Sequence, residues 1–257
     1  MQGDFVTITS VIQQKGGVGK STTAQAIGAY YANKGMKVLL VDLDSQRNLT
    51  LATGKDGDLS SYDMLISPDK TAAAIVTVKD NLDLVPADAR LAGIDAALSE
   101  IKVGKEYRLR EAFAVISDRY DHIVIDTPPA LSLLTINALT VSDRIVVPAQ
   151  ADVFSLAAIQ DISGTIETVR KYTNPKLVVS GILLTRYNKR PRLTADLTNI
   201  MQDMAKALGT KVYDTKIREA VAIREAQALK QDIFTYAPDS KVAADYLAFC
   251  EELDGRR

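Results

Sequence analysis

Residues 15–22 read Lys-Gly-Gly-Val-Gly-Lys-Ser-Thr, a variant of the phosphate-binding loop, and no other segment constrains the fold as strongly. In the generic loop, G-x-x-x-x-G-K-[ST], backbone N–H groups surround the phosphates, the lysine binds the β/γ oxygens and the hydroxyl binds Mg²⁺. Gln14 stands where the first glycine of that pattern would be, and the residues after it compensate. The run therefore predicts a nucleotide contacted by Lys15, Gly16, Gly17, Val18, Gly19, Lys20, Ser21 and Thr22.

The extra lysine at the loop entrance, Lys15, indicates how such a protein would use its nucleotide. Its side chain cannot easily reach the γ-phosphate held by its own loop, whereas it can reach one across a symmetric dimer. The variant loop thus suggests a nucleotide sandwiched between two subunits, and a switch rather than a metabolic kinase.

The sequence on either side of the loop has the character that a phosphate-binding loop requires. Residues 5–12 are β-branched and apolar enough for a buried parallel strand. Residues 22–34 form an Ala-rich helical run, and Gly35 is placed to end it. A helix that begins at the loop points its free N–H groups at the phosphates.

Strand-like apolar runs alternate with amphipathic helical runs, which predicts an α/β fold: a doubly wound, mostly parallel sheet with helices on both faces. The further predicted strands are Val38–Asp42, Leu82–Ala87, His122–Thr127, Arg144–Gln150, Leu177–Tyr187 and Lys211–Ile217. The predicted helices include Tyr107–Asp118, Phe154–Tyr172, Leu193–Leu208 and a last one near Asp239–Leu253. Residues 54–77 are the least regular segment and are expected on the surface. Without a Pro/Gly-rich linker or a repeat, residues 1–257 are expected to form a single domain.

The composition excludes several classes of chemistry. Cys250 is the only cysteine, which rules out a disulfide within the chain and a cysteine-ligated cluster within one subunit. His122 is the only histidine, which argues against a histidine-based metal site or triad. The formal net charge is −1, so any nucleic-acid contact must come from a local patch. No apolar run approaches the ~18 residues of a membrane span and no signal-peptide pattern is present, so the expected compartment is the cytoplasm.

Two carboxylates close the second predicted strand, where open α/β sheets place their chemistry. Asp42 and Asp44 are two residues apart and face the same side of an extended segment. A carboxylate there can orient an attacking water and help to hold Mg²⁺. The alternative for either residue is that it only caps the following turn.

The strand over residues 122–127 ends in a third acid. Apolar residues closed by Asp126 form the Walker-B pattern, in which the aspartate holds Mg²⁺, often through a water. The pattern is weak alone and becomes strong with the phosphate-binding loop upstream. Pro128 and Pro129 remove two backbone donors and restrict the turn, which suits a segment that senses the γ-phosphate.

Four blocks together resemble the ParA/MinD superfamily of deviant Walker-A ATPases, and within it the short, Soj-like ParA partition ATPases. The blocks are Lys15–Thr22, Asp42–Gln46, Asp126–Pro129 and Leu131–Asp143, and the resemblance extends from Phe5 to about Leu253. It implies ATP and Mg²⁺ as cofactors, a slow ATPase activity stimulated by a ParB-like partner, and a homodimer on ATP binding. It also implies non-specific binding to double-stranded DNA and a place on the nucleoid.

The resemblance assigns roles to the matched positions. Lys15 would reach the partner subunit's nucleotide, Lys20 would bind the β/γ-phosphates and Thr22 the α-phosphate side. Ser21 and Asp126 would hold Mg²⁺, and Asp44 would position the hydrolytic water and lie at the metal. Asp42 is expected beside the nucleotide, and Asn188 and Pro238 are candidates for the base. The chain departs from the family at Ser45, where proline is usual, and at Gln13, where asparagine is frequent.

Four arginines are candidates for DNA. Such binding needs cations that neutralise phosphates and no element that reads bases. The loop after residues 177–187 is basic, and further arginines follow residues 211–217. Arginines that match Arg190 and Arg218 resemble those that bind DNA in Soj-like proteins. The candidates are Arg190, Arg192, Arg218 and Arg224, with a solvated basic loop or contact with the nucleotide base as the alternatives.

Two rival interpretations remain within the superfamily. A MinD-like membrane-cycling ATPase would carry a basic amphipathic C-terminal helix, whereas residues 248–257 contain three acids before two arginines, so no membrane partner is expected. A relative that positions another cargo with the same DNA cycle is not separated from a partition ATPase by the sequence.

Overall fold

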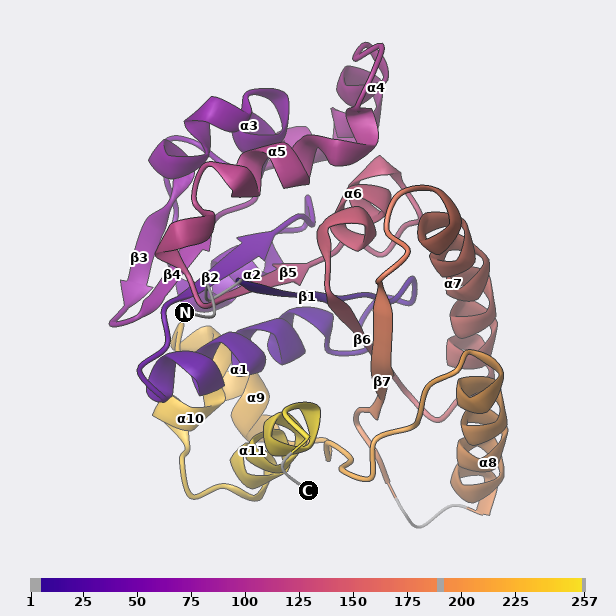
Figure 1. Ribbon diagram of the computed structural model, residues 1–257. Helices are drawn as coiled ribbons and strands as arrows, with labels where there is room; N and C mark the ends of the chain where they lie inside the picture. The colour runs from indigo at the N-terminus through magenta and orange to yellow at the C-terminus, as the bar shows by residue number, and fades with distance from the viewer. Residues whose placement is uncertain (1–5, 189–191, 256–257) are drawn as a thin grey trace, which may run out of the picture.

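The computed structural model describes residues 6–188 and 192–255, and seven strands within these residues form one sheet (Figure 1). The strand order is β3-β4-β2-β5-β1-β6-β7, and every neighbouring pair is parallel except β3 with β4. The strands are β1 Thr7–Val11, β2 Val38–Asp42, β3 Val76–Lys79, β4 Leu82–Val85, β5 His122–Asp126, β6 Arg144–Ala149 and β7 Val178–Leu184. The predicted α/β, doubly wound sheet is confirmed.

Helices cover both faces of this sheet (Figure 1). One face carries α1, α9, α10 and α11, and the other carries α3 to α7. The α-helices are α1 Lys20–Asn33, α2 Asn48–Thr53, α3 Ser61–Ile66, α4 Ile94–Ser99, α5 Arg108–Ala114, α6 Leu133–Val141, α7 Val153–Tyr172, α8 Arg192–Ala207, α9 Val221–Ala228, α10 Ile233–Tyr236 and α11 Lys241–Leu253.

The period of two along each strand explains why both faces are covered. In β2, Val38 and Leu40 belong to the core shared with α1 and α11, whereas Leu39 and Val41 belong to the core under α3 to α6. All four side chains are fully buried. A strand with apolar side chains on both faces requires a layer on each side, as in other parallel sheets.

The predicted strand over residues 211–217 is wrong. Among the described residues, this segment contacts β7 through an isolated bridge between Ile182 and Val212 and through a hydrogen bond from the Ile217 N–H to the Leu184 carbonyl at 2.8 Å, and it forms no regular strand. The backbone N–H groups of Asp214 and Thr215 donate instead to the Glu252 carboxylate of α11, at 2.9 and 3.0 Å. A side chain thus takes the donors that a strand ladder would need.

The prediction that residues 54–77 are the least regular segment and lie on the surface holds for residues 54–58 and is wrong for the rest. The segment contains α3, the 3₁₀-helix Pro68–Ala74 and the start of β3. Ser60 accepts from the backbone N–H of Tyr62 and forms a capping box with Asp63, which starts α3. Met64 and Leu65 of that helix are fully buried, so the segment supplies part of the core.

The C-terminal helix α11 is packed into the core that contains α1. Its Tyr246, Phe249 and Cys250 are buried there, and burial raises the pKa of the Cys250 thiol. At its end, Asp254 accepts hydrogen bonds from the hydroxyl groups of Tyr30 (3.1 Å) and Tyr31 (2.5 Å) of α1. No helix in the described part of the chain is long and apolar enough to cross a membrane.

Candidate nucleotide-binding site

The loop between β1 and α1 has the backbone shape that its glycines permit. Gly17 and Gly19 have φ angles of 74° and 86°, in the left-handed region that residues with a Cβ rarely adopt. Gly19 is the N-cap of α1, so the helix begins at Lys20 and directs its free N–H groups into the loop. The Thr185 hydroxyl, after β7, donates to the carbonyl oxygen of Val18 at 2.8 Å and fixes the loop to the sheet.

A cavity of about 450 Å³ lies in front of the loop, and we call it the front cavity. The start of α1 lines one side, and the segment from β2 to α2 lines another, including Asp44. Of the predicted site residues, the structure brings together Gly16, Gly17, Gly19, Lys20, Ser21, Thr22 and Asp44 on its wall. Val18 is buried behind the loop instead.

The register of the sheet places the Walker-B acid at the base of this site. Asp126 of β5 is the partner of Val11 in β1 and of Asp42 in β2, so its side chain ends where the loop begins. Asp126 is fully buried, and neither carboxylate oxygen accepts a hydrogen bond of normal geometry from a described residue. Burial and then the charge of Asp42 raise the pKa of Asp126 well above its usual value, although the Ser21 hydroxyl lowers it.

An unpaired buried carboxylate facing a hydroxyl fits a hard cation. Mg²⁺ is usually held by one or two carboxylates together with waters and phosphate oxygens. The described residues contain no cluster of three acidic, histidine or cysteine side chains that could hold a metal alone. Ser21 and Asp126 would therefore hold Mg²⁺ jointly with the phosphates of a nucleotide.

Lys20 interacts electrostatically with Asp126 and Asp44. Its side chain is buried, and burial lowers the pKa of its ammonium while the charges of Asp126 and Asp44 raise it. A buried ammonium near two carboxylates stays charged only through its partners. The start of α1 thus carries a lysine side chain beside two acids, at the place where phosphate charge would be bound.

Asp42 and Asp44 differ in what they contact. Asp42 is fully buried, accepts from the backbone N–H of Asp44 (3.0 Å), and accepts from both the N–H and the hydroxyl of Thr50 (2.9 and 2.7 Å). Its carboxylate therefore anchors the loop that carries Asp44 and does not line the front cavity. Among the described residues, the Asp44 carboxylate accepts from the backbone N–H of Gln46 at 3.0 Å, and it lines the cavity.

Replacement of Asp126 by asparagine should stabilise the nucleotide-free protein. A carboxyl group whose folded-state pKa lies above its unfolded value weakens folding as the pH rises from the unfolded to the folded pKa, and the loss then persists. We expect Asp126→Asn to raise the Tm at pH 7, with little gain near pH 4, where protonation of the carboxyl group removes most of the difference between the folded and unfolded states. Thermal unfolding at both pH values measures this.

The same variant should lose the stabilisation that ATP and Mg²⁺ give to the wild type. Asp80→Asn, in the exposed turn between β3 and β4, is the matched control and should change neither quantity. An unchanged Tm for Asp126→Asn at pH 7 would show that the buried carboxyl group does not reduce the stability of the folded protein.

Lys15 is held within its own subunit. Its ammonium forms an ion pair with Asp152, the N-cap of α7, and donates to the side-chain oxygen of Gln150 at 3.0 Å. It also lies 6.0 Å from the centre of the Phe154 ring, which is 72% exposed. Lys15 therefore does not line the front cavity of its own chain.

A second, smaller cavity of about 150 Å³, the inner cavity, adjoins Gly19 and Thr22. It is lined by Arg186, Arg218, Arg224 and Gln227, and Gln227 donates to the Thr22 hydroxyl at 3.1 Å. Sequence reasoning missed Arg186 and Gln227, because neither lies in a motif. The structure places Arg224 on the wall of this cavity.

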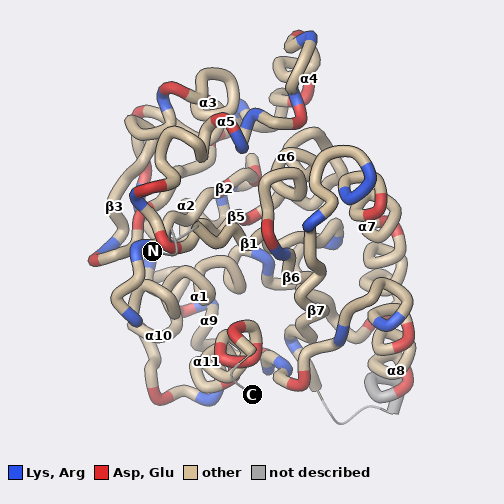
Figure 2. Tube along the Cα trace, viewed as in Figure 1, with Lys and Arg blue, Asp and Glu red and all other residues tan. Residues whose placement is uncertain are grey.

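The remaining predicted residues lie elsewhere. Asn188 follows β7 and Pro238 is exposed between α10 and α11, and neither lines the front or the inner cavity. Arg190 lies outside the described residues, and Arg192 begins α8 with its side chain outside the described part. Arg218 is exposed and paired with Asp245 of α11. Basic and acidic positions are interspersed along the trace in Figure 2.

The fold and the site define a P-loop nucleotide-binding protein. Residues 6–179 match the family described as an AAA domain. The sporulation initiation inhibitor protein Soj of Bacillus subtilis is 37% identical over 96% of this chain and 97% of its own. The chromosome partitioning protein ParA of Caulobacter vibrioides is 34% identical over 100% of this chain and 97% of its own. The chain belongs to the ParA/Soj family of P-loop ATPases.

A solved structure with a different name shares the fold. The cobyrinic acid a,c-diamide synthase of Mycobacterium smegmatis, with bound ADP and magnesium, has a TM-score of 0.82 and 32% identity over 98% of this chain and 97% of its own. That structure holds a nucleotide and a magnesium ion, as the site geometry described above would require.

Proposed function

We propose that this protein is a DNA-partition ATPase that binds ATP and Mg²⁺, forms an ATP-sandwich dimer and then binds DNA without sequence preference. A ParB-like partner would stimulate slow hydrolysis and release the protein from DNA. The chain would act as a single domain in the cytoplasm, on the nucleoid. The observation that carries the proposal is the cluster of Lys20, Asp44 and Asp126 at the loop, in a chain related over its full length to partition proteins.

The residues of the front cavity would catalyse hydrolysis by positioning the reactants and by stabilising negative charge. Lys20 and the start of α1 would bind the phosphates, and Ser21 and Asp126 would hold Mg²⁺, which neutralises phosphate charge when bound. Asp44 would orient the attacking water, since its carboxylate lines the cavity and has one hydrogen-bond partner among the residues that the structure describes. Asp42 would keep that loop in register through Thr50.

The dimer would be built on the face that carries Lys15. Leu131, Val153 and Phe154 are exposed apolar side chains near the ends of β5 and β6, on the side of the loop. Exposed apolar side chains near a ligand site are typical of an interface that forms with the ligand. A second copy would cover them and bring each Lys15 to the opposite nucleotide.

Among the rival interpretations, the partition function has the stronger support. Both full-length relatives named above carry partition or Soj names, and neither name refers to a membrane. A relative that positions another cargo would use the same ATP and DNA steps. The diamide synthase that is 32% identical has a name that refers to a different activity. Measurement of DNA binding distinguishes that activity from the partition function that we propose.

A mobility shift on random-sequence duplex DNA tests the proposal. We expect binding with ATP and Mg²⁺, little or none with ADP or without nucleotide, and a steep loss of binding between about 50 and 200 mM salt because phosphate contacts release counterions. A protein that binds ATP and shifts no DNA in any nucleotide state would overturn the partition function. Salt-insensitive binding would contradict the electrostatic mode.

A further inference from the structure

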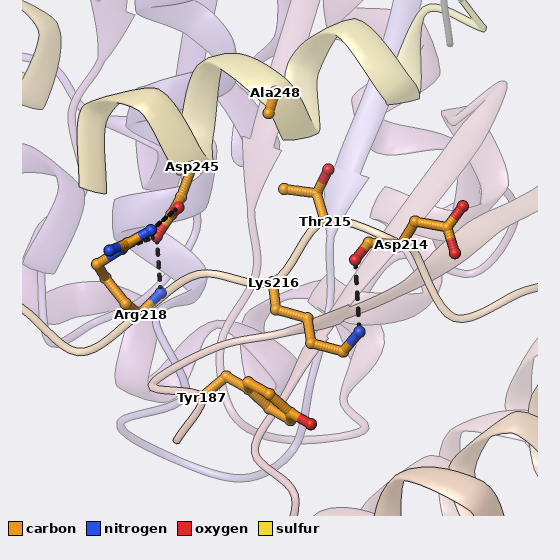
Figure 3. Close-up of a pocket in the computed structure, with 7 residues that line it drawn as sticks. All are labelled: Tyr187, Asp214, Thr215, Lys216, Arg218, Asp245 and Ala248. Atoms are coloured by element: carbon orange, nitrogen blue, oxygen red, sulfur yellow. Dashed lines mark hydrogen bonds and ion pairs between the residues drawn. The ribbon is translucent and has the colours of Figure 1, made fainter. Parts of the chain in front are cut away.

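A surface pocket of about 580 Å³ lies beyond the inner cavity, and we call it the outer pocket. The segment after β7 contributes Tyr187, the 211–218 segment contributes Thr215, Lys216 and Arg218, and α11 contributes Asp245 (Figure 3). Arg218 lines both the outer pocket and the inner cavity, so it stands between the nucleotide side and the surface.

The Asp245 carboxylate binds the guanidinium group of Arg218. The two nitrogens Nε and Nη2 donate to the carboxylate at 2.6 and 2.7 Å, and the backbone N–H of Arg218 donates to it at 3.0 Å. The Arg218 side chain is 47% exposed, whereas that of Asp245 is 12% exposed. The pair is thus open to solvent on the arginine side, where a second anion can approach.

An arginine binds phosphate with the same geometry as it binds the carboxylate in this pair. A guanidinium fork binds a carboxylate or a phosphate through the same two parallel N–H donors. A DNA phosphate that approaches Arg218 therefore competes with Asp245 for those donors.

Lys216 supplies a second cation in the outer pocket. Its ammonium donates a long bond of 3.4 Å to the carbonyl oxygen of Asp214 and lies 5.4 Å from the centre of the Tyr187 ring. Figure 3 shows the Asp214 carboxylate directed away from the Lys216 ammonium. A half-buried ammonium with one long hydrogen bond to the described residues retains donors for an anion.

We infer that the outer pocket receives a backbone phosphate of DNA on Lys216 and Arg218, and that Asp245 is a built-in competitor that lowers DNA affinity. This inference rests on the proposed DNA-partition function. It adds Lys216 to the DNA contacts and gives Asp245 a regulatory role. Because the same arginine lines the inner cavity, the competition lies next to the nucleotide.

Removal of the Asp245 charge should strengthen DNA binding. For Asp245→Asn we expect the dissociation constant for random duplex DNA with ATP and Mg²⁺ to fall roughly 1.5-fold to fivefold, the range for removal of one exposed ion pair. The gain should disappear when Arg218→Ala is added, because the carboxylate acts through that arginine. Lys216→Ala should weaken binding and reduce the slope of log affinity against log salt by about 0.9 for each DNA phosphate that the variant no longer neutralises.

Two controls change charge at the amino-terminal ends of strands, whereas Tyr187 of the outer pocket follows the carboxyl end of β7. Asp118→Asn, before β5, and Lys176→Ala, before β7, should leave both the affinity and the salt slope unchanged. Thermal unfolding of every variant distinguishes a folding defect from a DNA-binding defect, and Lys216→Ala tests the pocket without breaking the Asp245 pair.

The outcomes separate the two proposals. If the wild type binds no DNA with ATP and Mg²⁺, the partition function and this inference both fail. If the wild type binds DNA but Asp245→Asn gives no gain, or a gain that persists with Arg218→Ala, the competition is refuted and the partition function stands. An unchanged salt slope in Lys216→Ala removes that lysine from the residues that bind DNA.

Discussion

Replacement of Asp44 by alanine should reduce ATP hydrolysis by roughly a hundredfold or more while leaving ATP binding intact. The side chain lines the front cavity and, within the described part of the chain, accepts from one backbone N–H, so its other acceptor positions are available to a water. The loop itself should persist, because Asp42 anchors it through Thr50. With hydrolysis blocked, the protein should remain in its ATP-bound dimer on DNA.

Phosphate release in single and multiple turnovers measures this effect, together with ATP affinity by calorimetry. Asp58→Ala, an exposed acid a few residues after α2, is the matched control and should hydrolyse ATP at the wild-type rate. Hydrolysis at the normal rate in Asp44→Ala would show that another group positions the water.

Replacement of Lys15 by alanine should abolish the ATP-dependent dimer without preventing nucleotide binding. In the single subunit this ammonium is paired with Asp152 and Gln150 and lies outside the front cavity. Its loss therefore removes no contact with the nucleotide of its own chain. In a dimer, the substitution would remove one cation from beside each γ-phosphate. Because the dimer has two nucleotides, its interface would lose two such contacts.

Sedimentation of the protein with ATP and Mg²⁺, in the Asp44→Ala background so that ATP persists, measures the dimer. Lys55→Ala, an exposed lysine after α2, should dimerise as the parent does. An ATP-dependent dimer in the Lys15→Ala protein would refute the contact across the subunits.

The parts of the fold that can be predicted from the sequence are those whose signals are local. The strand Val38–Asp42 is predicted with its observed bounds, because a short apolar run closed by an acid is typical of a buried parallel strand. The predicted strands near residues 82, 122, 144 and 178 are confirmed, with ends that differ by up to three residues. The position of the phosphate-binding loop between β1 and α1 follows from the same local pattern.

The parts that cannot be predicted in this way depend on contacts between distant segments. The carboxylate of Glu252 in α11 takes the backbone donors of residues 214 and 215, and no local pattern shows this. The edge strand β3 has only four residues, two of them charged or hydroxylated, and is defined by its antiparallel pairing with β4. Gln227 reaches the nucleotide side because α9 packs near α1, about 200 residues earlier in sequence.

The roles of the site residues likewise depend on contacts that the sequence does not reveal. Sequence spacing places Asp42 and Asp44 on one side of the strand, but only the structure separates the anchor from the group that lines the cavity. Likewise, Arg224 and Arg218 are similar in sequence context, yet the first lines only the inner cavity and the second also borders the outer pocket.

The buried thiol of Cys250 can be used to measure how often α11 opens from the rest of the fold. A thiol that is fully buried, with a raised pKa, reacts with an alkylating reagent only when the helix opens locally. The same helix carries Asp245 and Glu252, which hold the Arg218 backbone and the 211–217 segment. The rate of alkylation at this single cysteine therefore measures, without any added label, how often the scaffold of the outer pocket comes apart in each nucleotide state.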